Sequence, residues 1–476
     1  MNFMVYDLIF LVVFAIAIAI FLYSRRKGVK KEGMLLLYRT QVGIKLINYA
    51  GKKYKKILYA LSYISIFIGY LLMVGAVYLV GRIVYLYVAF PQVVKAMKIP
   101  PIMPLIPYLP SMFKLNFLPP FYFTYWIIVL AIIAITHEFS HGIFGKRFGI
   151  RIKSTGFGFF PFFLPVFLAA FVEQDDKQMA KKDKFSQMAM LSAGTFANVL
   201  TAIFFFVILL GLFSVAFMPI GVEFDTYAYS IVSIGDISSI NGGNFTNLSY
   251  ENMLDSLKEN ETSRIIAGNA SYLATKDFLK QQKDASRYVI LYDDAPAINA
   301  NLTGVITEID GVPIKNKESL SEELLQHSPG DKVGIKTKTG EESLSYEIIL
   351  SENPNNNNTP WLGIGFYDNQ KTGMISKTYL ALSYFKEDGV KYEPKFGGIT
   401  IFIYNLVWWI VLISISVALV NMLPVGIFDG GRFFYLTILA ITKKEKIAKN
   451  VFSFMTYLFL IVLLVLMIIW GYSFFA

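Results

Sequence analysis

The sequence predicts a polytopic α-helical membrane protein of about six transmembrane helices, with one α/β domain inserted between two of them. The 476 residues are 55% hydrophobic and only 16% charged, and their mean hydropathy is +0.51. A helix crosses a bilayer with about 20 predominantly apolar residues. Apolar stretches of about that length occupy residues 8–23, 57–80, 121–146, 189–218, 398–423 and 450–473. The long polar block 220–397 interrupts them and predicts the inserted domain.

The basic residues predict how the chain is oriented in the membrane. Residues 24–56 contain eleven Lys and Arg against one acidic residue, and residues 442–449 contain four Lys against one Glu. Cytoplasmic loops carry such an excess of positive charge. Alternation of the spans then places 146–188 in the cytoplasm as well, and 91–120 and 220–397 outside. The net charge of +10 is therefore assigned to the membrane surface, and no nucleic-acid partner is predicted.

The polar block carries a second sign of an outer location. Six Asn-x-Ser/Thr sequons lie within 220–397 and none lies elsewhere, as expected of extracytoplasmic surface. Their asparagines are Asn244, Asn247, Asn260, Asn269, Asn301 and Asn357. The chain has no cysteine, which excludes disulfides, thiolate nucleophiles and thiolate metal ligands.

Two of the three histidines stand in the stretch ITHEFSHGIFG, residues 135–145, near the inner end of the third span. Polar groups inside a bilayer are costly and need a partner. On a helix, His137 and His141 share one face, so both imidazoles can bind one metal ion. Glu138 lies one residue further round, where it can accept a proton from an attacking water molecule. This HExxH pattern is typical of zinc proteases.

A catalytic zinc ion usually has three protein ligands. The remaining histidine, His327, lies in the outer block, so the better candidate is Asp429 in NMLPVGIFDGGRF, residues 421–433, which interrupts the fifth span. Irregular backbone at membrane depth occurs only where protein or a water cavity satisfies it, and a carboxylate there needs a cation nearby. The sequence therefore predicts one zinc ion per chain, bound by His137, His141 and Asp429.

HEFSH in one span and NMLPVGIFDGG in a later one together resemble the site-2 protease family of intramembrane metalloproteases. That family combines HExxH with N-x-x-P-x-x-x-x-D-G, and Asn421, Pro424, Asp429 and Gly430 match every fixed position of the second motif. The resemblance implies a multi-pass protein of the cell membrane that cuts membrane-spanning protein substrates within their transmembrane segments, in regulated intramembrane proteolysis. The sequons and the lack of cysteine favour an archaeal membrane.

Two further segments resemble the same family. Residues 148–173 look like its hairpin that re-enters the membrane, and LSAGTFANVL, residues 191–200, resembles its AGPxxN element with Thr195 in place of the usual proline. Asn198 matches the family's asparagine near the active site, which makes Asn198 and Asn421 candidate hydrogen-bond donors to the oxyanion. The hairpin also offers a strand edge with which an unwound substrate can pair.

The second half of the outer block reads as short strands and turns around a helix-like segment, ESLSEELLQH. This order resembles a PDZ domain of bacterial and archaeal proteases, with residues 241–284 as an insertion. The predicted divisions are an N-terminal transmembrane hairpin with its outer loop, two halves of a catalytic membrane core facing the cytoplasm, an extracytoplasmic PDZ-like domain, and a last loop and helix. In that order their residues are 1–120, 121–218 with 398–440, 219–397, and 441–476.

Two other functions fit parts of the sequence. A membrane metalloprotease of another family could turn HExxH toward water and use Glu173, on the inner side, as its third ligand. That architecture does not need N-x-x-P-x-x-x-x-D-G. A PDZ-bearing receptor or an ion-binding transporter would explain a broken span with a carboxylate, but it does not need HExxH with its glutamate. Each alternative leaves one of the two motifs unexplained.

Overall fold

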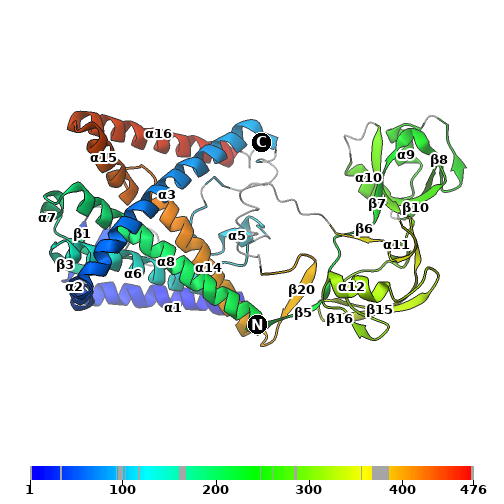
Figure 1. The fold of residues 1–476 in the computed structure, drawn as a ribbon, viewed down its shortest axis with the longest axis horizontal. Coiled ribbons are helices and arrows are strands. Elements are labelled where there is room, and N and C mark those ends of the chain that lie inside the picture. The colour runs from blue at the N-terminus through cyan, green and yellow to red at the C-terminus, as the bar shows by residue number, and fades with distance from the viewer. Residues whose placement is uncertain are drawn as a thin grey trace. The chain divides into compact units, whose positions relative to one another are not determined.

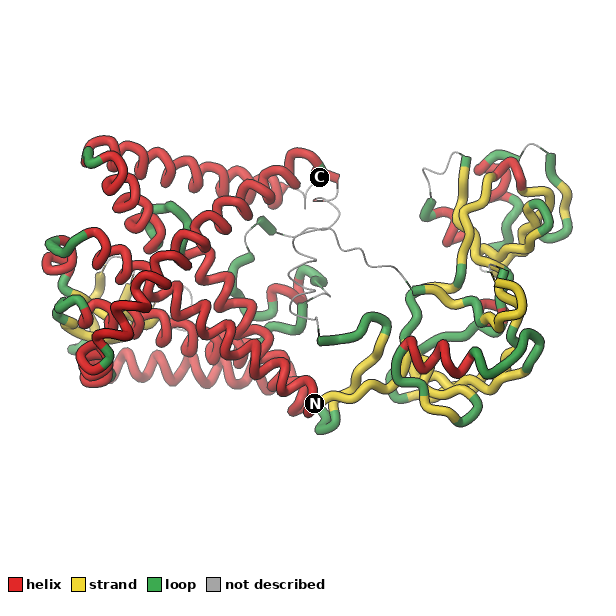
Figure 2. Tube along the Cα trace, viewed as in Figure 1, coloured by secondary structure: helices red, strands yellow, loops and turns green. Residues whose placement is uncertain are grey.

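The polar block and the apolar spans form two separate compact units, Ser214–Gly397 and Met1–Phe213 with Gly398–Ala476. Helices dominate the unit of the spans and strands dominate the other (Figure 2). The computed structural model (Figure 1) describes residues 3–32, 35–92, 94, 100–101, 103–115, 118–159, 168–246, 248–259, 261–282, 287–354, 356–366 and 385–472.

Six helices in the described residues are long and apolar enough to cross a membrane, which confirms the predicted number of spans. They are α1 (Phe3–Ser24), α3 (Lys55–Ala89), α6 (Phe123–Arg147), α8 (Lys184–Ala216), α14 (Gly398–Asn421) and α16 (Glu445–Tyr472). The helices α3 and α8 have 35 and 33 residues. They are longer than the apolar stretches that predicted them, because a helix can continue past the hydrocarbon region into polar turns. The chain is thus a polytopic membrane protein with an additional β region.

The first span carries a buried acidic residue, Asp7, that caps α6. Its carboxylate accepts hydrogen bonds from the backbone N–H groups of Phe123 and Thr124, at 2.8 and 2.9 Å, and from the Thr124 hydroxyl at 2.5 Å. The Tyr108 hydroxyl donates to the same carboxylate. The first N–H groups of a helix have no partner within the helix, and its positive end favours a carboxylate. Asp7 therefore fixes α1 to the first turn of α6.

The other end of α6 is held by the short helix α2 (Ile44–Lys53), which packs along it. A Cβ added at Gly142 would lie 3.1 Å from the Ile47 side chain, and one at Gly51 would lie 2.7 Å from Cβ of Lys146. The two helices approach this closely because glycines face the contact. Two further short helices of this unit are α5 (Leu109–Met112) and α7 (Asp176–Ala180).

The fifth span breaks where the second motif begins. The helix α14 ends at Asn421, and α15 (Asp429–Thr442) starts after an irregular segment. Pro424 lies in this break and cannot donate a helical hydrogen bond. A Cβ added at Gly430 would lie only 2.6 Å from the carbonyl oxygen of Leu423. The glycine after Asp429 thus lets the start of α15 pack directly against the irregular segment that follows α14.

Four antiparallel strands form a sheet beside α6. They are β1 (Val29–Glu32), β2 (Leu35–Thr40), β3 (Ile152–Phe159) and β4 (Leu168–Gln174), in that spatial order. The strands β3 and β4 pair antiparallel within the segment predicted to re-enter the membrane, 148–173. Residues 160–167, where the re-entrant tip is predicted, lie outside the described residues, so its re-entry stays a prediction. The strand β2 pairs with β3, with Tyr38 opposite Phe157. This leaves β4 at one edge of the sheet, packed against α6.

The described residues of the second unit form two six-stranded sheets with separate apolar cores. The first sheet has the order β16-β15-β13-β5-β20. Its strands are β5 (Phe217–Val222), β13 (Val305–Ile309), β15 (Lys332–Thr339), β16 (Glu342–Ile349) and β20 (Val390–Pro394), with β14 (Val312–Pro313) paired to β13. Residues of α11 (Pro296–Asn299) and α12 (Lys317–Leu324) complete its core. The PDZ-like assignment of this part stays a prediction.

The second sheet is formed by the segment expected as an insertion, 241–284, together with strands on either side of it. Its order is β7-β12-β11-β10-β8-β9. The strands are β7 (Tyr229–Ser233), β8 (Ile237–Ile240), β9 (Gly243–Asn244), β10 (Thr262–Ala267), β11 (Ala270–Thr275) and β12 (Tyr288–Asp293), with helices α9 (Tyr250–Asp255) and α10 (Lys276–Lys280). Two small pairs complete the unit, β6 (Thr226–Tyr227) with β19 (Ile364–Gly365) and β17 (Ser351–Asn353) with β18 (Asn356–Trp361).

Candidate metal centre

The helix α6 and the start of α15 bring three potential metal ligands together. The Nε2 atoms of His137 and His141 are 3.0 Å apart. The Asp429 Oδ2 atom lies 3.4 and 3.2 Å from these two nitrogens. Ligands at about 2.0–2.1 Å from a tetrahedral zinc ion are about 3.3 Å from one another. The three residues therefore fit a single zinc ion, which would keep a fourth position for water or substrate.

The position of Asp429 follows from the break after α14. Asp429 is the first residue of α15, so its carboxylate lies at the positive end of that helix. The positive end of a helix favours the carboxylate form of this side chain, which is the form that binds a metal ion.

The helix α8 lies behind both imidazoles. The Nδ1 atom of His141 is 2.7 Å from the backbone carbonyl oxygen of Met190, and the side-chain amide of Asn198 is 3.1 Å from Nδ1 of His137. Between them, a Cβ added at Gly194 would lie 2.6 Å from Nε2 of His137 and still closer to Nε2 of His141. The imidazole nitrogens that face Asp429 thus occupy the space left by a missing side chain.

Glu138 points toward the β-sheet. Its Oε2 atom accepts a hydrogen bond of 3.0 Å from the backbone N–H of Val172 on the edge strand β4. Within the described part of the chain, the group of potential ligands contains His137, His141 and Asp429 but not Glu138. The Glu138 carboxylate therefore lies outside the ligand group and is held by the backbone of β4.

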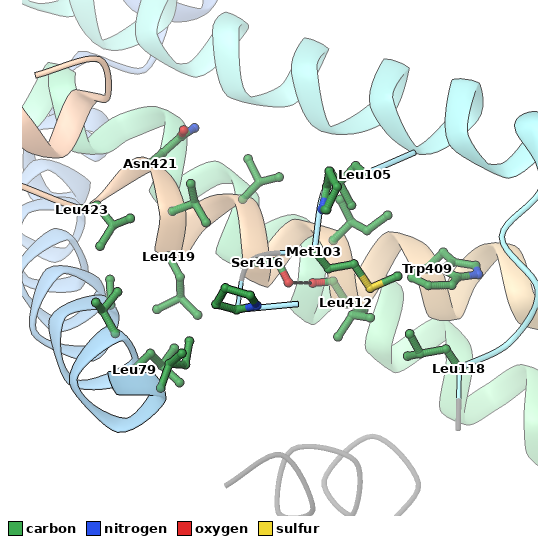
Figure 3. A pocket seen from close by; sticks show the side chains of 18 of the residues that line it. Leu79, Met103, Leu105, Leu118, Trp409, Leu412, Ser416, Leu419, Asn421 and Leu423 are labelled. Atoms are coloured by element: carbon green, nitrogen blue, oxygen red, sulfur yellow. Dashed lines mark hydrogen bonds between the residues drawn. The ribbon is translucent and has the colours of Figure 1, made fainter. Parts of the chain in front are cut away.

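Asn421 does not contact the three ligands in any interaction found among the described residues. It lines an apolar cavity of about 440 Å³ bounded by α3, the loop before α6, and α14 (Figure 3). Leu79, Met103 and Trp409 are among the other lining residues. The structure thus places Asn198, but not Asn421, in contact with the ligand group.

The two other candidate ligands are engaged elsewhere. Glu173 accepts hydrogen bonds from the Ser154 hydroxyl and the Arg39 guanidinium, and these lower the pKa of its carboxyl. His327 belongs to the second unit, where its Nε2 atom lies 3.7 Å from an oxygen of Asp310 and 3.8 Å from one of Glu323. Neither residue belongs to the described ligand group.

Sequence reasoning missed Met190, Gly194 and Val172. Met190 and Val172 act through backbone groups, which every residue type can supply and which the sequence therefore does not mark. Gly194 did have one, because it belongs to the AGTFAN segment, and a glycine within a long apolar helix often marks a close approach.

Comparison with known proteins settles the family. A family model described as Peptidase family M50 matches residues 125–466, well over half of the chain. The chain belongs to peptidase family M50. This is the site-2 protease family, so the resemblance shown by the two motifs is confirmed. Family M50 proteins are zinc-dependent metallopeptidases, in agreement with the two histidines and the aspartate of this M50 chain.

One curated relative is described as uncharacterized protein MJ0971 of Methanocaldococcus jannaschii. It is 31% identical over 195 residues, which cover 40% of this M50 chain and 48% of the relative. The match thus spans about half the length of that protein.

Proposed function

We propose that this chain is an intramembrane zinc metalloprotease that hydrolyses peptide bonds within transmembrane segments of membrane-anchored proteins. The observation that supports this most is the group of His137, His141 and Asp429, whose spacing fits one tetrahedral zinc ion. Two of these residues lie on a helix apolar enough to span the bilayer, and the third follows the break of another. A substrate bond cleaved there lies at membrane depth.

The roles of the residues follow from their positions. When bound, zinc lowers the pKa of a water molecule and polarises a carbonyl group. Glu138 accepts a proton from the attacking water and delivers it to the leaving amine. An unwound substrate segment could pair with the edge strand β4 by displacing contacts that this edge makes with α6, among them the bond from the Val172 N–H to Glu138. The oxyanion role of Asn198 and Asn421 stays a prediction.

The metal content of purified variants tests the ligand group. We expect one zinc ion per chain, lost in His137→Ala and His141→Ala and weakly held in Asp429→Ala, because each change removes one of three ligands. His327→Ala is the matched control, since it removes the remaining histidine, and should keep its zinc. Elemental analysis gives the stoichiometry, and the mass of cleavage products from a labelled single-span membrane protein locates the cut. Full zinc occupancy and activity in Asp429→Ala would refute the assignment of Asp429 as the third ligand. A cut outside the apolar span of the substrate would refute intramembrane cleavage.

The proposed orientation puts the catalytic side in the cytoplasm and the second unit outside. Because the chain has no cysteine, single cysteines can report it. Ser321 lies in the second unit and Lys446 near the start of α16, and both are exposed. An impermeant thiol reagent applied to intact cells should label Ser321→Cys strongly and Lys446→Cys only after lysis. The opposite pattern would mean an inverted topology.

A further inference from the structure

The face of α8 behind the ligand group is built from three residues spaced four apart. Met190, Gly194 and Asn198 follow one another at i, i+4 and i+8, so they form one line along the helix. The first contacts His141, the second leaves space for both imidazoles, and the third contacts His137. The three residues contact the rings of both histidines, which points to a role in orienting the two imidazoles.

At His141 the hydrogen bond fixes the tautomer. A backbone carbonyl can only accept, so the Nδ1 atom of His141 must carry the proton that it shares with the Met190 oxygen. In the neutral ring Nε2 then has a free lone pair. That nitrogen faces the ligand group, so His141 is prepared to bind a metal ion.

At His137 the group next to Nδ1 is the Asn198 side chain. Asn198 is fully buried, and its Oδ1 atom has no hydrogen-bond partner among the described residues. Its Nδ2 atom lies at Nδ1 of His137. A donor there would leave the ring proton on Nε2 and block metal binding. Half a turn of the amide exchanges its nitrogen and oxygen, which presents Oδ1 as an acceptor to Nδ1–H of His137 and frees Nε2.

We propose that Asn198 is a positioning residue of the metal centre, whose amide oxygen accepts the Nδ1–H of His137 as the Met190 carbonyl does for His141. The inference rests on the proposed metal centre and assigns a role different from that of an oxyanion donor. Asn198 contacts His137 at the ring nitrogen that does not face the other ligands. Hydrogen-bond partners of this kind orient metal-bound histidines, and their loss typically weakens metal affinity about 10- to 100-fold.

The affinity of the full-length protein for Zn²⁺, measured in detergent by competition with a chromogenic chelator, tests the proposal. We expect Asn198→Ala to bind zinc about 10- to 100-fold more weakly than the parent protein. Asn198→Asp should bind within a few-fold of the parent, because a carboxylate also accepts the Nδ1–H. The matched control is Asn405→Ala, which removes another buried asparagine side chain from a spanning helix and should leave zinc affinity unchanged.

Two outcomes would overturn the inference, and they are distinguishable from failure of the metal centre itself. If Asn198→Ala binds zinc like the parent while His137→Ala does not, the metal centre stands and the positioning role is wrong. If Asn198→Asp is as weak as Asn198→Ala, the site needs something other than an acceptor. If His137→Ala also binds zinc like the parent, the ligand assignment on which the inference rests is wrong.

Discussion

Replacement of Glu138 by glutamine is expected to abolish peptide-bond cleavage while zinc stays bound. Proton transfer by a positioned carboxylate contributes about 10²- to 10⁴-fold to the rate, and a glutamine amide cannot accept the proton. The fold should be kept, because the glutamine carbonyl oxygen can still accept the Val172 N–H. The measurement combines zinc content with the initial rate of cleavage of a labelled single-span membrane protein in detergent. Normal cleavage by a zinc-loaded Glu138→Gln protein would exclude the proposed mechanism.

Glu173→Gln is the control for this variant. Glu173 follows Val172 directly on β4, but its carboxylate binds Ser154 and Arg39 instead of the ligand group. We expect its zinc content and cleavage rate to remain near those of the parent. Loss of zinc in Glu173→Gln would favour the other architecture, in which this residue is the third ligand.

Replacement of Gly194 by alanine is expected to weaken zinc binding and slow cleavage together. The added methyl group would lie 2.6 Å from Cε1 and Nε2 of His137 and closer still to His141. These atoms belong to the rings of His137 and His141, so the imidazoles must move apart to make room. Displacement of catalytic groups by about 1 Å can cost about 100-fold in rate. Zinc affinity and the cleavage rate should both fall, while circular dichroism shows unchanged helix content.

Gly211→Ala provides the matched control on the same helix. A Cβ added at Gly211 meets no atom within 4 Å, and alanine is the better helix former by about 1 kcal/mol. This variant should bind zinc and cleave like the parent. Equal loss of zinc in both variants would show that α8 is sensitive to any change, and normal zinc binding by Gly194→Ala would show that the ligands do not need this space.

The spans and the two histidines of the ligand group could be predicted because their sequence signals are local. Twenty apolar residues mark a span wherever they occur, and His137 and His141 are neighbours on any helix. Asp429 is far from them in sequence. It was predictable because a carboxylate beside a break in an apolar span needs a cation. The need of a carboxylate for a cation therefore predicted the contact between Asp429 and the two histidines, which hydrophobic periodicity alone does not predict.

The strands β1 and β2 were not predicted for the opposite reason. Residues 24–56 show a strong excess of basic residues, which indicates a cytoplasmic loop but says nothing about strands. The strand β2 exists through its pairing with β3, more than one hundred residues later, where Arg39 lies opposite Gly156. Strand pairing over such distances depends on the partner's position. The backbone contacts at Met190 and Val172 escaped prediction because any residue supplies a carbonyl or an N–H.

The cap that Asp7 provides for α6 has a consequence for assembly. Asp7 lies before residue 125, where the family match begins, yet it satisfies the first N–H groups of the helix that carries HExxH. A buried donor left without its acceptor costs about 1–3 kcal/mol. During synthesis α1 emerges roughly one hundred residues ahead of α6, so the acceptor is already present when its donors arrive. The segment that matches the family therefore does not contain this acceptor, and in this chain the first helix supplies it.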